Sequence, residues 1–282
     1  MVLQSPLKLQ VLVSAVKQDA RQLAAKMNLS TDTVMVNQCG KYGYEEFEIQ
    51  KQAMPKVEDE KEVVFEPGRV QCFSMAEKGV GLSRNTALLH ADSDICLFSD
   101  EDIVLEDNYA EAVLETYEKY PDADMILFNV KVTPSRRTYW NEEVKRIRWY
   151  NYGRYPAYSI SGKLEALRRA NAHFSLLFGG GAKYSNGEDS LFLRDCLKAG
   201  LKIYAVPVCI GEEMERESTW FHGYTEKFFE DRGVLYHYLY GKMAKPFSLR
   251  FLLKNKGEMC QEISFKQAYA LMCKGIYSQK RK

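Results

Sequence analysis

The stretch Ile-Cys-Leu-Phe-Ser-Asp-Glu-Asp-Ile-Val-Leu-Glu-Asp, residues 95–107, decides the fold of this chain. Its first four residues form an apolar run, which predicts a short strand buried on both faces of a sheet. Asp100, Glu101 and Asp102 follow directly after Ser99. Because burying unpaired charges is costly, we expect these acids at the carboxyl end of the strand. Open α/β sheets bind their ligands at this end.

Asp100 and Asp102 are two residues apart, so in extended backbone their side chains point the same way and could share one ion or ligand. Carboxylate oxygens suit Mg²⁺ or Mn²⁺, which typically bind nucleotide phosphates together with one or two carboxylates. An acidic triplet after a strand is also typical of a solvated turn or of a helix N-terminus. The triplet alone leaves both interpretations open.

The composition is that of an ordinary globular protein. The chain has 282 residues, of which 46% are hydrophobic and 27% charged, enough for one large α/β domain or for a domain with a small appendage. A net charge of +1 indicates no particular partner. The seven cysteines include no C-x-x-C pair, which predicts reduced thiols and neither a disulfide framework nor a zinc site. Without an apolar leader or a run of about 20 apolar residues, we expect a cytoplasmic protein.

Strand and helix patterns alternate along the chain, which predicts a mostly parallel sheet with right-handed crossovers. Residues 41–68 are polar and predict an irregular surface excursion. We place the main domain at 1–240 and a helical tail at 241–282. Further strands are expected at 9–15, 33–36, 69–74, 125–130 and 201–206, the last ended by Pro207, and helices at 19–27, 86–91, 107–119, 190–198 and 226–240.

Two glycine-rich segments and one acidic pair stand at expected turns. Gly79-Val80-Gly81 precedes a helix and is either a phosphate-binding loop or a plain helix-entry turn. Gly179-Gly180-Gly181 forms a turn that can approach a ligand closely. Glu188 and Asp189 open the next helix. Asp189 is therefore either a capping acid that complements the helix dipole or a positioned general base.

Residues 131–170 mix basic and aromatic side chains. From Arg136 to Arg169 there are nine bases and three acids, with seven Trp and Tyr residues interleaved. No nucleic-acid-binding signature accompanies them, so we expect no nucleic-acid partner. A groove for an anionic or sugar-bearing acceptor and a set of core aromatics with solvated arginines remain open.

The tail, residues 242–282, holds ten bases and two acids among apolar residues with helical spacing. Basic amphipathic helices of this kind can lie on an anionic membrane surface. A helical appendage packed on the main domain explains the same pattern. Both interpretations remain open.

Taken in order, these segments resemble family 2 glycosyltransferases with the GT-A fold, over about residues 9–240. The matching stretches are L-Q-V-L-V-S-A, G-V-G-L-S-R-N-T-A-L, L-F-S-D-E-D, N-G-E-D-S-L-F-L and S-T-W-F-H-G-Y. The N-Q-C after the second strand and the F-G-G-G-A-K before G-E-D resemble bacterial enzymes that build capsular or other surface polysaccharides.

The resemblance implies roles for individual residues. In the D-x-D element, Asp100 would meet the ribose of the donor and Asp102 would hold a Mn²⁺ or Mg²⁺ ion on the diphosphate. Asp100 and His222 are further candidate metal ligands. Asp189 would be the base that deprotonates the acceptor hydroxyl, with Glu188 as the fallback. The family inverts the anomeric centre.

One departure from the family pattern concerns the nucleotide base. Many members have an aspartate after the second strand to accept from the uracil N3–H, whereas this chain has Asn37 and Gln38. An amide oxygen can accept the same hydrogen bond, so a uridine donor is retained. Ser14 and Lys78 are further candidates for nucleotide contact. Arg84, in the S-R-N stretch, marks the motif and is either functional or structural.

We therefore predict an inverting, metal-dependent glycosyltransferase. It would move a sugar from a nucleotide-diphosphate donor, a UDP-sugar, to a hydroxyl of a glycan or lipid-linked glycan, in surface polysaccharide synthesis. Peripheral contact with the inner membrane face through residues 242–282 is a separate hypothesis. The alternatives are a nucleotidyltransferase of similar sheet architecture and a non-catalytic nucleotide- or glycan-binding protein.

Overall fold

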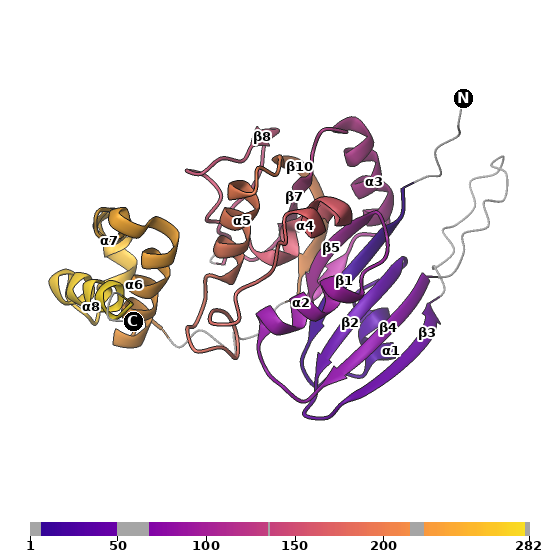
Figure 1. Cartoon of the computed structure of the whole chain (residues 1–282), viewed down its shortest axis with the longest axis horizontal. Helices are drawn as coiled ribbons and strands as arrows, with labels where there is room; N and C mark the ends of the chain where they lie inside the picture. The colour runs from indigo at the N-terminus through magenta and orange to yellow at the C-terminus, as the bar shows by residue number, and fades with distance from the viewer. Residues whose placement is uncertain (1–6, 50–67, 135, 215–222, 280–282) are drawn as a thin grey trace.

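A computed structural model shows one mixed sheet covered by helices, with a cluster of helices at one end (Figure 1). It describes residues 7–49, 68–134, 136–214 and 223–279. The sheet order is β3-β4-β2-β1-β5-β9-β7-β10-β6, and β8 pairs with β10. The strands are β1 (Leu9–Ala15), β2 (Asp32–Gln38), β3 (Gly43–Ile49), β4 (Gly68–Met75), β5 (Ile95–Asp100), β6 (Ile103–Leu105), β7 (Met125–Lys131), β8 (Lys145–Arg146), β9 (Ile160–Lys163) and β10 (Ile203–Glu213).

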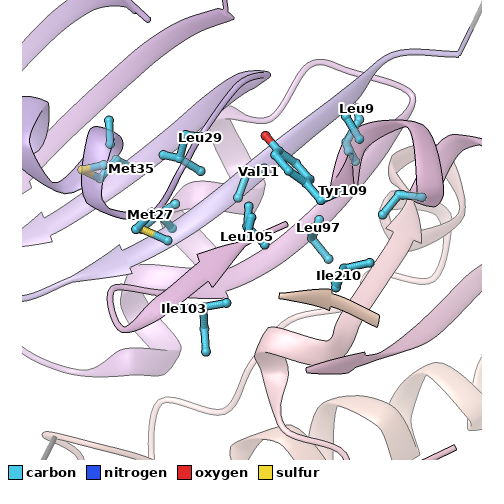
Figure 2. Close-up of a cluster of buried hydrophobic side chains, with 14 of the residues drawn as sticks. Leu9, Val11, Met27, Leu29, Met35, Leu97, Ile103, Leu105, Tyr109 and Ile210 are labelled. Atoms are coloured by element: carbon cyan, nitrogen blue, oxygen red, sulfur yellow. The ribbon is translucent and has the colours of Figure 1, made fainter. Parts of the chain in front are cut away.

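Helices cover both faces of this sheet, and each face has its own apolar core. On one face α1 and α3 pack on β1 and β5, and Figure 2 shows part of this core, with Tyr109 of α3 next to Val11 and Leu97. On the other face lie α2, α4 and α5, with Phe174 and Phe192 stacked 4.1 Å apart. The helices are α1 (Ala20–Lys26), α2 (Val80–His90), α3 (Tyr109–Lys119), α4 (Leu164–Arg169), α5 (Glu188–Lys198), α6 (Glu226–Tyr240), α7 (Ala244–Met259) and α8 (Phe265–Ser278), with short 3₁₀ turns η1 (Ala157–Ser159) and η2 (Gly241–Met243).

The strands predicted from apolar runs form the parallel part of the sheet. β1 pairs in parallel with β2 and β5, and β2 pairs in parallel with β4. Every residue of β1 is buried, as expected for a strand covered on both faces. Asp100 is the last residue of β5, and the other two acids form the turn into β6. The acids therefore lie at the carboxyl edge of the sheet, and the predicted α/β architecture is confirmed.

The prediction of an irregular excursion over residues 41–68 is wrong for its first part. β3 is an edge strand that pairs antiparallel with β4 along its whole length. Most of its side chains are exposed, so its polar composition hid a strand held mainly by backbone hydrogen bonds. A cross-strand contact between Tyr44 and Phe73, with ring centroids 5.0 Å apart, adds to these bonds. Residues 50–67 lie outside the described part of the chain.

The prediction that the last strand ends at Pro207 is also wrong. β10 continues to Glu213 and pairs antiparallel with β6 beyond the proline. Its register with β7 shifts between Ala205 and Cys209. This bulge places the proline where the missing N–H breaks no regular ladder bond, so the strand can run on.

The C-terminal helices form a third apolar cluster. α8 packs along α6, and the two helices cross at Gly233 and Gly275. A Cβ at Gly233 would lie 2.1 Å from the Met272 oxygen, so only glycine allows this close approach. Ala268, Met272 and Ile276 of α8 are thus buried in the cluster with α6, as the packed-appendage interpretation expects. The domain boundary at residue 240 stays a prediction. None of the helices in the described ranges is long and apolar enough to span a bilayer.

Candidate active site

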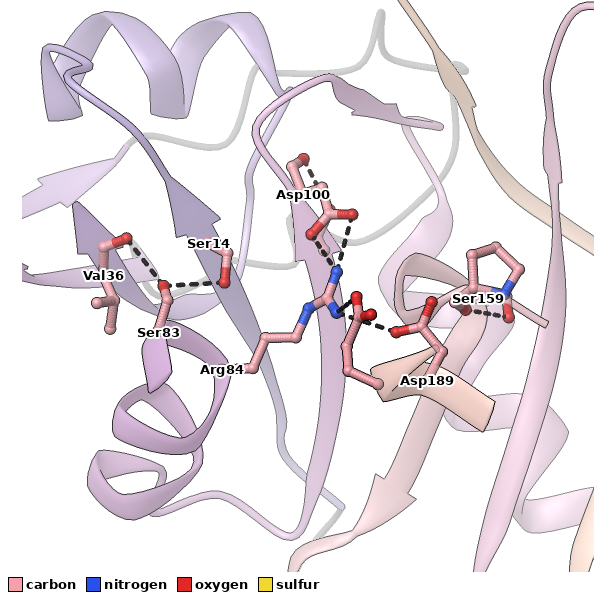
Figure 3. A network of polar contacts seen from close by, with 10 residues as sticks. Ser14, Val36, Ser83, Arg84, Asp100, Ser159 and Asp189 are labelled. Carbon is pink, nitrogen blue, oxygen red and sulfur yellow. Dashed lines mark hydrogen bonds and ion pairs between the residues drawn. The ribbon is translucent and has the colours of Figure 1, made fainter. Parts of the chain in front are cut away.

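Four charged side chains from three elements meet at the carboxyl end of β5 (Figure 3). Arg84 projects from α2, Asp100 ends β5, and Glu188 and Asp189 begin α5. One guanidinium nitrogen of Arg84 (Nη2) donates to both oxygens of Asp100, at 2.9 and 3.1 Å. The other (Nη1) donates to Glu188 and Asp189, at 3.0 Å each. A single arginine therefore joins the D-x-D acid to the E-D pair.

Burial makes this cluster electrostatically unusual. The Arg84 side chain is 5% exposed and faces three carboxylates with one positive charge. Burial alone would lower the pKa of Arg84, but Asp100, Asp189 and Glu188 outweigh it and raise that pKa above its ordinary value. Burial, followed by the charge of Glu188, raises the pKa of Asp189 well above its ordinary value of 3.8, and Arg84 opposes this rise. A carboxylate with a raised pKa is a better proton acceptor, as a general base requires.

The two glycine segments pack against each other and fix the start of both helices. The backbone N–H of Val80 donates to the Gly180 oxygen at 2.9 Å. Gly179 has a φ of +102°, and a Cβ there would lie 2.8 Å from the Glu188 carboxyl carbon. Helix α2 begins at Val80 rather than near Thr86, because the turn ends at the Gly79 cap. The glycines thus allow the backbone to approach Glu188 closely.

The predicted nucleotide-contacting residues lie at the neighbouring strand ends. Ser14 Oγ, at the end of β1, is 2.9 Å from Ser83 Oγ of α2 (Figure 3). The Asn37 amide bonds the backbone of Gln18 twice, accepting at 3.2 Å and donating at 2.7 Å. Gln38 Oε1 accepts from the Gly79 N–H at 2.6 Å. The amide oxygens expected to read a uracil base are therefore engaged with backbone in this structure. Lys78 is exposed next to the glycine turn.

The donor set for a metal ion consists of the two D-x-D acids. Asp102 is buried beside the turn, and its backbone oxygen accepts from the Met214 N–H at 2.8 Å. Among the described residues no group of three His, Cys, Asp or Glu side chains could hold an ion. His222 lies outside the described residues. One or two carboxylates suit an ion that is completed by substrate phosphates rather than by a protein cage, so the residues fit Mg²⁺ or Mn²⁺ arriving with a diphosphate.

The basic and aromatic segment 131–170 approaches the site at Ala157. The backbone of Ala157, in η1, lowers the pKa of Asp189. Tyr152 and Tyr155 are buried in the core, whereas Trp149 and Tyr150 are exposed. The buried tyrosines agree with the interpretation of this segment as core aromatics, and the groove for an acceptor stays a prediction.

Arg84 is the residue of this cluster whose role the sequence left undecided. The sequence contains a signal for this role. Arg84 lies three residues before Ala87 and four before Leu88, on the buried face of α2. A charged residue on the apolar face of a helix requires a buried partner of opposite sign. The clusters of acids in D-E-D and G-E-D were the candidate partners.

Comparisons with known proteins agree with this architecture. Residues 53–174 match the sequence profile of Glycosyl transferase family 2. A search of curated proteins by sequence gives no match. The structure is similar to that of Staphylococcus aureus TarS 1-349 in complex with UDP-GlcNAc, with a TM-score of 0.58, 14% identity, and 96% of this chain and 77% of that chain covered.

Two further structures of the same protein show the same likeness. A second crystal structure of S. aureus TarS 1-349 has a TM-score of 0.59 and 12% identity, with 96% of this chain and 82% of that chain covered. The longer S. aureus TarS has a TM-score of 0.57 and 12% identity, with 92% and 46% covered. At these identities the likeness concerns the fold. With the profile match over residues 53–174, it indicates a glycosyltransferase on a GT-A fold.

Proposed function

We propose that the enzyme transfers a sugar from a UDP-sugar to a hydroxyl of a glycan or lipid-linked glycan, with inversion, in the synthesis of a surface polysaccharide. The observation that carries this proposal is the bridge from Asp100 through Arg84 to Asp189. It holds an acid of the D-x-D element and a candidate base in one buried cluster. The UDP and UDP-GlcNAc complexes of the structurally similar TarS support a uridine donor.

Asp189 is the proposed base. Its raised pKa suits removal of a proton from an acceptor hydroxyl, whose oxygen then attacks the anomeric carbon. The bond from that carbon to the diphosphate breaks, and the electron pair leaves with the nucleoside diphosphate. Attack from the face opposite the leaving group inverts the configuration. Glu188, bound to the same nitrogen of Arg84, is the alternative base.

Asp102, with Asp100 and His222 as further ligands, would hold a divalent ion on the diphosphate. Such an ion offsets the charge that develops on the leaving group. In this structure Asp100 gives both oxygens to Arg84, so binding an ion through Asp100 requires part of that bridge to open. Asp102 is accordingly the first of the proposed ligands.

The acceptor would lie along the segment 131–170, because this segment reaches Asp189 at Ala157. Its exposed Trp149 and Tyr150 and its excess of bases suit a sugar-bearing or anionic acceptor. A nucleic-acid partner is not proposed. The basic tail is proposed to contact an anionic membrane.

Product analysis tests the proposal. Purified enzyme incubated with a UDP-sugar, Mn²⁺ and a glycan acceptor should release UDP and form a β-linked product from an α-linked donor. Release of pyrophosphate would indicate a nucleotidyltransferase instead. Asp189→Asn should bind donor as the parent does but lose about 10²-fold or more of transfer. Asp195→Asn, the same change on the exposed part of α5, should be unaffected. An active Asp189→Asn would move the base to Glu188.

A further inference from the structure

Helix α7 has one face that nothing in the described structure covers. Its inward face packs in the C-terminal cluster through Ala244, Ser248 and Leu252. Leu249 and Leu253 are four residues apart on the opposite side, and they are 40% and 62% exposed. Met243, at the start of the helix, is 53% exposed. Three large apolar side chains thus lie on a single exposed helical surface.

Basic residues flank this apolar strip. Lys242, Arg250, Lys254 and Lys256 are all exposed, and the described part of the chain offers none of them a salt bridge or side-chain hydrogen bond. The acid of this helix, Glu258, instead accepts a hydrogen bond from Tyr224. We call the surface formed by residues 242, 243, 249, 250, 253, 254 and 256 the α7 outer face. It is positively charged and lacks acids.

We propose that the α7 outer face binds the anionic surface of a lipid bilayer, with Leu249 and Leu253 inserted between headgroups. A helix with a narrow apolar strip between Lys and Arg residues lies in the plane of such an interface. The basic side chains reach the headgroups while their stems stay with the leucines. α7 lies at the end of the molecule away from β3, where a flat surface can approach it (Figure 1).

Charge argues against a second copy of this chain as the occupant. A two-fold symmetric contact through this face would place four bases of one subunit against the same four bases of the other. Their repulsion opposes such a dimer, whereas an anionic bilayer neutralises all four. The proposal concerns a surface remote from Arg84 and does not rest on the assignment of the transferase reaction.

The test is flotation of the full chain with vesicles. With phosphatidylcholine vesicles that contain about 30% phosphatidylglycerol, the protein should float at low salt. It should not float with phosphatidylcholine alone. Raising the salt to about 0.5 M should release it, because the charges act across exposed solvent.

Two double variants separate the two parts of the face. Arg250→Gln with Lys254→Gln should lower the vesicle partition coefficient about 30-fold, because each removed base weakens binding about fivefold. Leu249→Ser with Leu253→Ser should also lose most binding. The matched controls are Leu89→Ser, an exposed leucine of α2, and Lys26→Gln, an exposed base of α1. Both should bind as the parent does.

Equal binding by the parent and both double variants would overturn the proposal, as would the absence of binding to anionic vesicles. A dimer in light scattering that the same variants convert to monomer would assign the face to self-association instead. Since the substituted side chains are exposed, the melting temperature of each variant should match the parent, which excludes unfolding as the cause of lost binding. Donor turnover without vesicles should be unchanged, so failure here is distinct from failure of the transferase assignment.

Discussion

Replacing Arg84 by methionine removes the cation that holds the active-site acids together, while keeping much of the volume of the side chain. In the parent protein Arg84 makes four hydrogen bonds to three carboxylates, at 2.9–3.1 Å. In Arg84→Met, Asp100, Glu188 and Asp189 would be left together without a counter-charge. The expected result is a large loss of stability and a changed pH dependence of the reaction.

The size of the stability loss follows from burial. Removing one partner of a buried ion pair costs about 3–5 kcal/mol, because the other charge stays buried and unpaired. Here the side chains of Asp100 and Asp189 are 26% and 23% exposed, so water can reach them. We therefore expect the lower end, about 3 kcal/mol. For a domain of this size that corresponds to a fall in melting temperature of about 6–12 °C.

The assay combines urea unfolding at pH 7.5 with a pH–rate profile. Because Arg84 lowers the pKa of Asp189, its removal should raise that pKa further, and the acidic limb of kcat/KM should move to higher pH. Arg84→Lys keeps the charge but lacks the guanidinium that reaches acids on both sides. Its stability and its acidic limb should therefore lie between those of the parent and Arg84→Met. The matched control is Arg69→Met, whose partly exposed pairs with Glu46 and Asp92, at 3.9 and 3.4 Å, should cost less than about 1 kcal/mol.

A loss in Arg84→Met no larger than in Arg69→Met would refute the claim that one guanidinium holds the cluster together. A stability loss with an unmoved acidic limb would show that Arg84 is structural and that Asp189 is not the titrating base. A change in the limb together with the loss of stability is the result that the geometry predicts.

Three further predictions concern the same site. Asp189→Asn should be more stable than the parent by about 1 kcal/mol at neutral pH. The folded-state pKa of Asp189 is raised, so Asp189 contributes most to the free energy of unfolding below its ordinary pKa of 3.8. This contribution is lost as the pH rises through the folded-state pKa. The stability advantage of Asp189→Asn should therefore grow from pH 4 to pH 8 in urea titrations. Gly179→Ala should cost about 2–4 kcal/mol and reduce turnover, because its Cβ would meet Val80 at 2.5 Å and Glu188 at 2.8 Å; Gly200→Ala, at a φ of +86° with nothing within 4 Å, should cost only the backbone strain of about 1–2 kcal/mol. Asp102→Ala should abolish any stabilisation by Mn²⁺ with UDP in a thermal-shift assay, and retained stabilisation would remove Asp102 from the metal site.

The parallel core of the fold could be predicted from sequence because its strands are buried on both faces. Apolar runs such as 9–15 and 95–98 have few other interpretations in a chain of this composition. The edge strand β3 could not be predicted in this way, since its exposed side chains carry no apolar signal. The extension of β10 past Pro207 depends on a register shift, which is a property of the strand pair and not of the proline.

The site could be predicted in its parts but not in its connections. The acids of residues 100–102 and 188–189 stood at expected turns, and the structure brings Asp100 and Asp189 to the same guanidinium. The contact between Arg84 and Asp189 joins residues that are 105 positions apart, and no local spacing encodes it. The amides of Asn37 and Gln38 had suitable chemistry for a base, yet their partners here are backbone groups of Gln18 and Gly79. Hydrogen-bond partners depend on tertiary packing, which sequence patterns do not specify.

The most direct test of the donor assignment is a thermal-shift titration of the full chain with UDP and UDP-GlcNAc, each with and without Mn²⁺. A ligand that binds only the folded state raises the stability by mass action, by about 2.7 kcal/mol at 100 times its Kd. We predict a Mn²⁺-dependent rise with both compounds that is absent in Asp102→Ala. Stabilisation by GDP or CDP compounds with no response to UDP would contradict the uridine donor, and no response to any nucleotide would contradict the account of this site as a donor site.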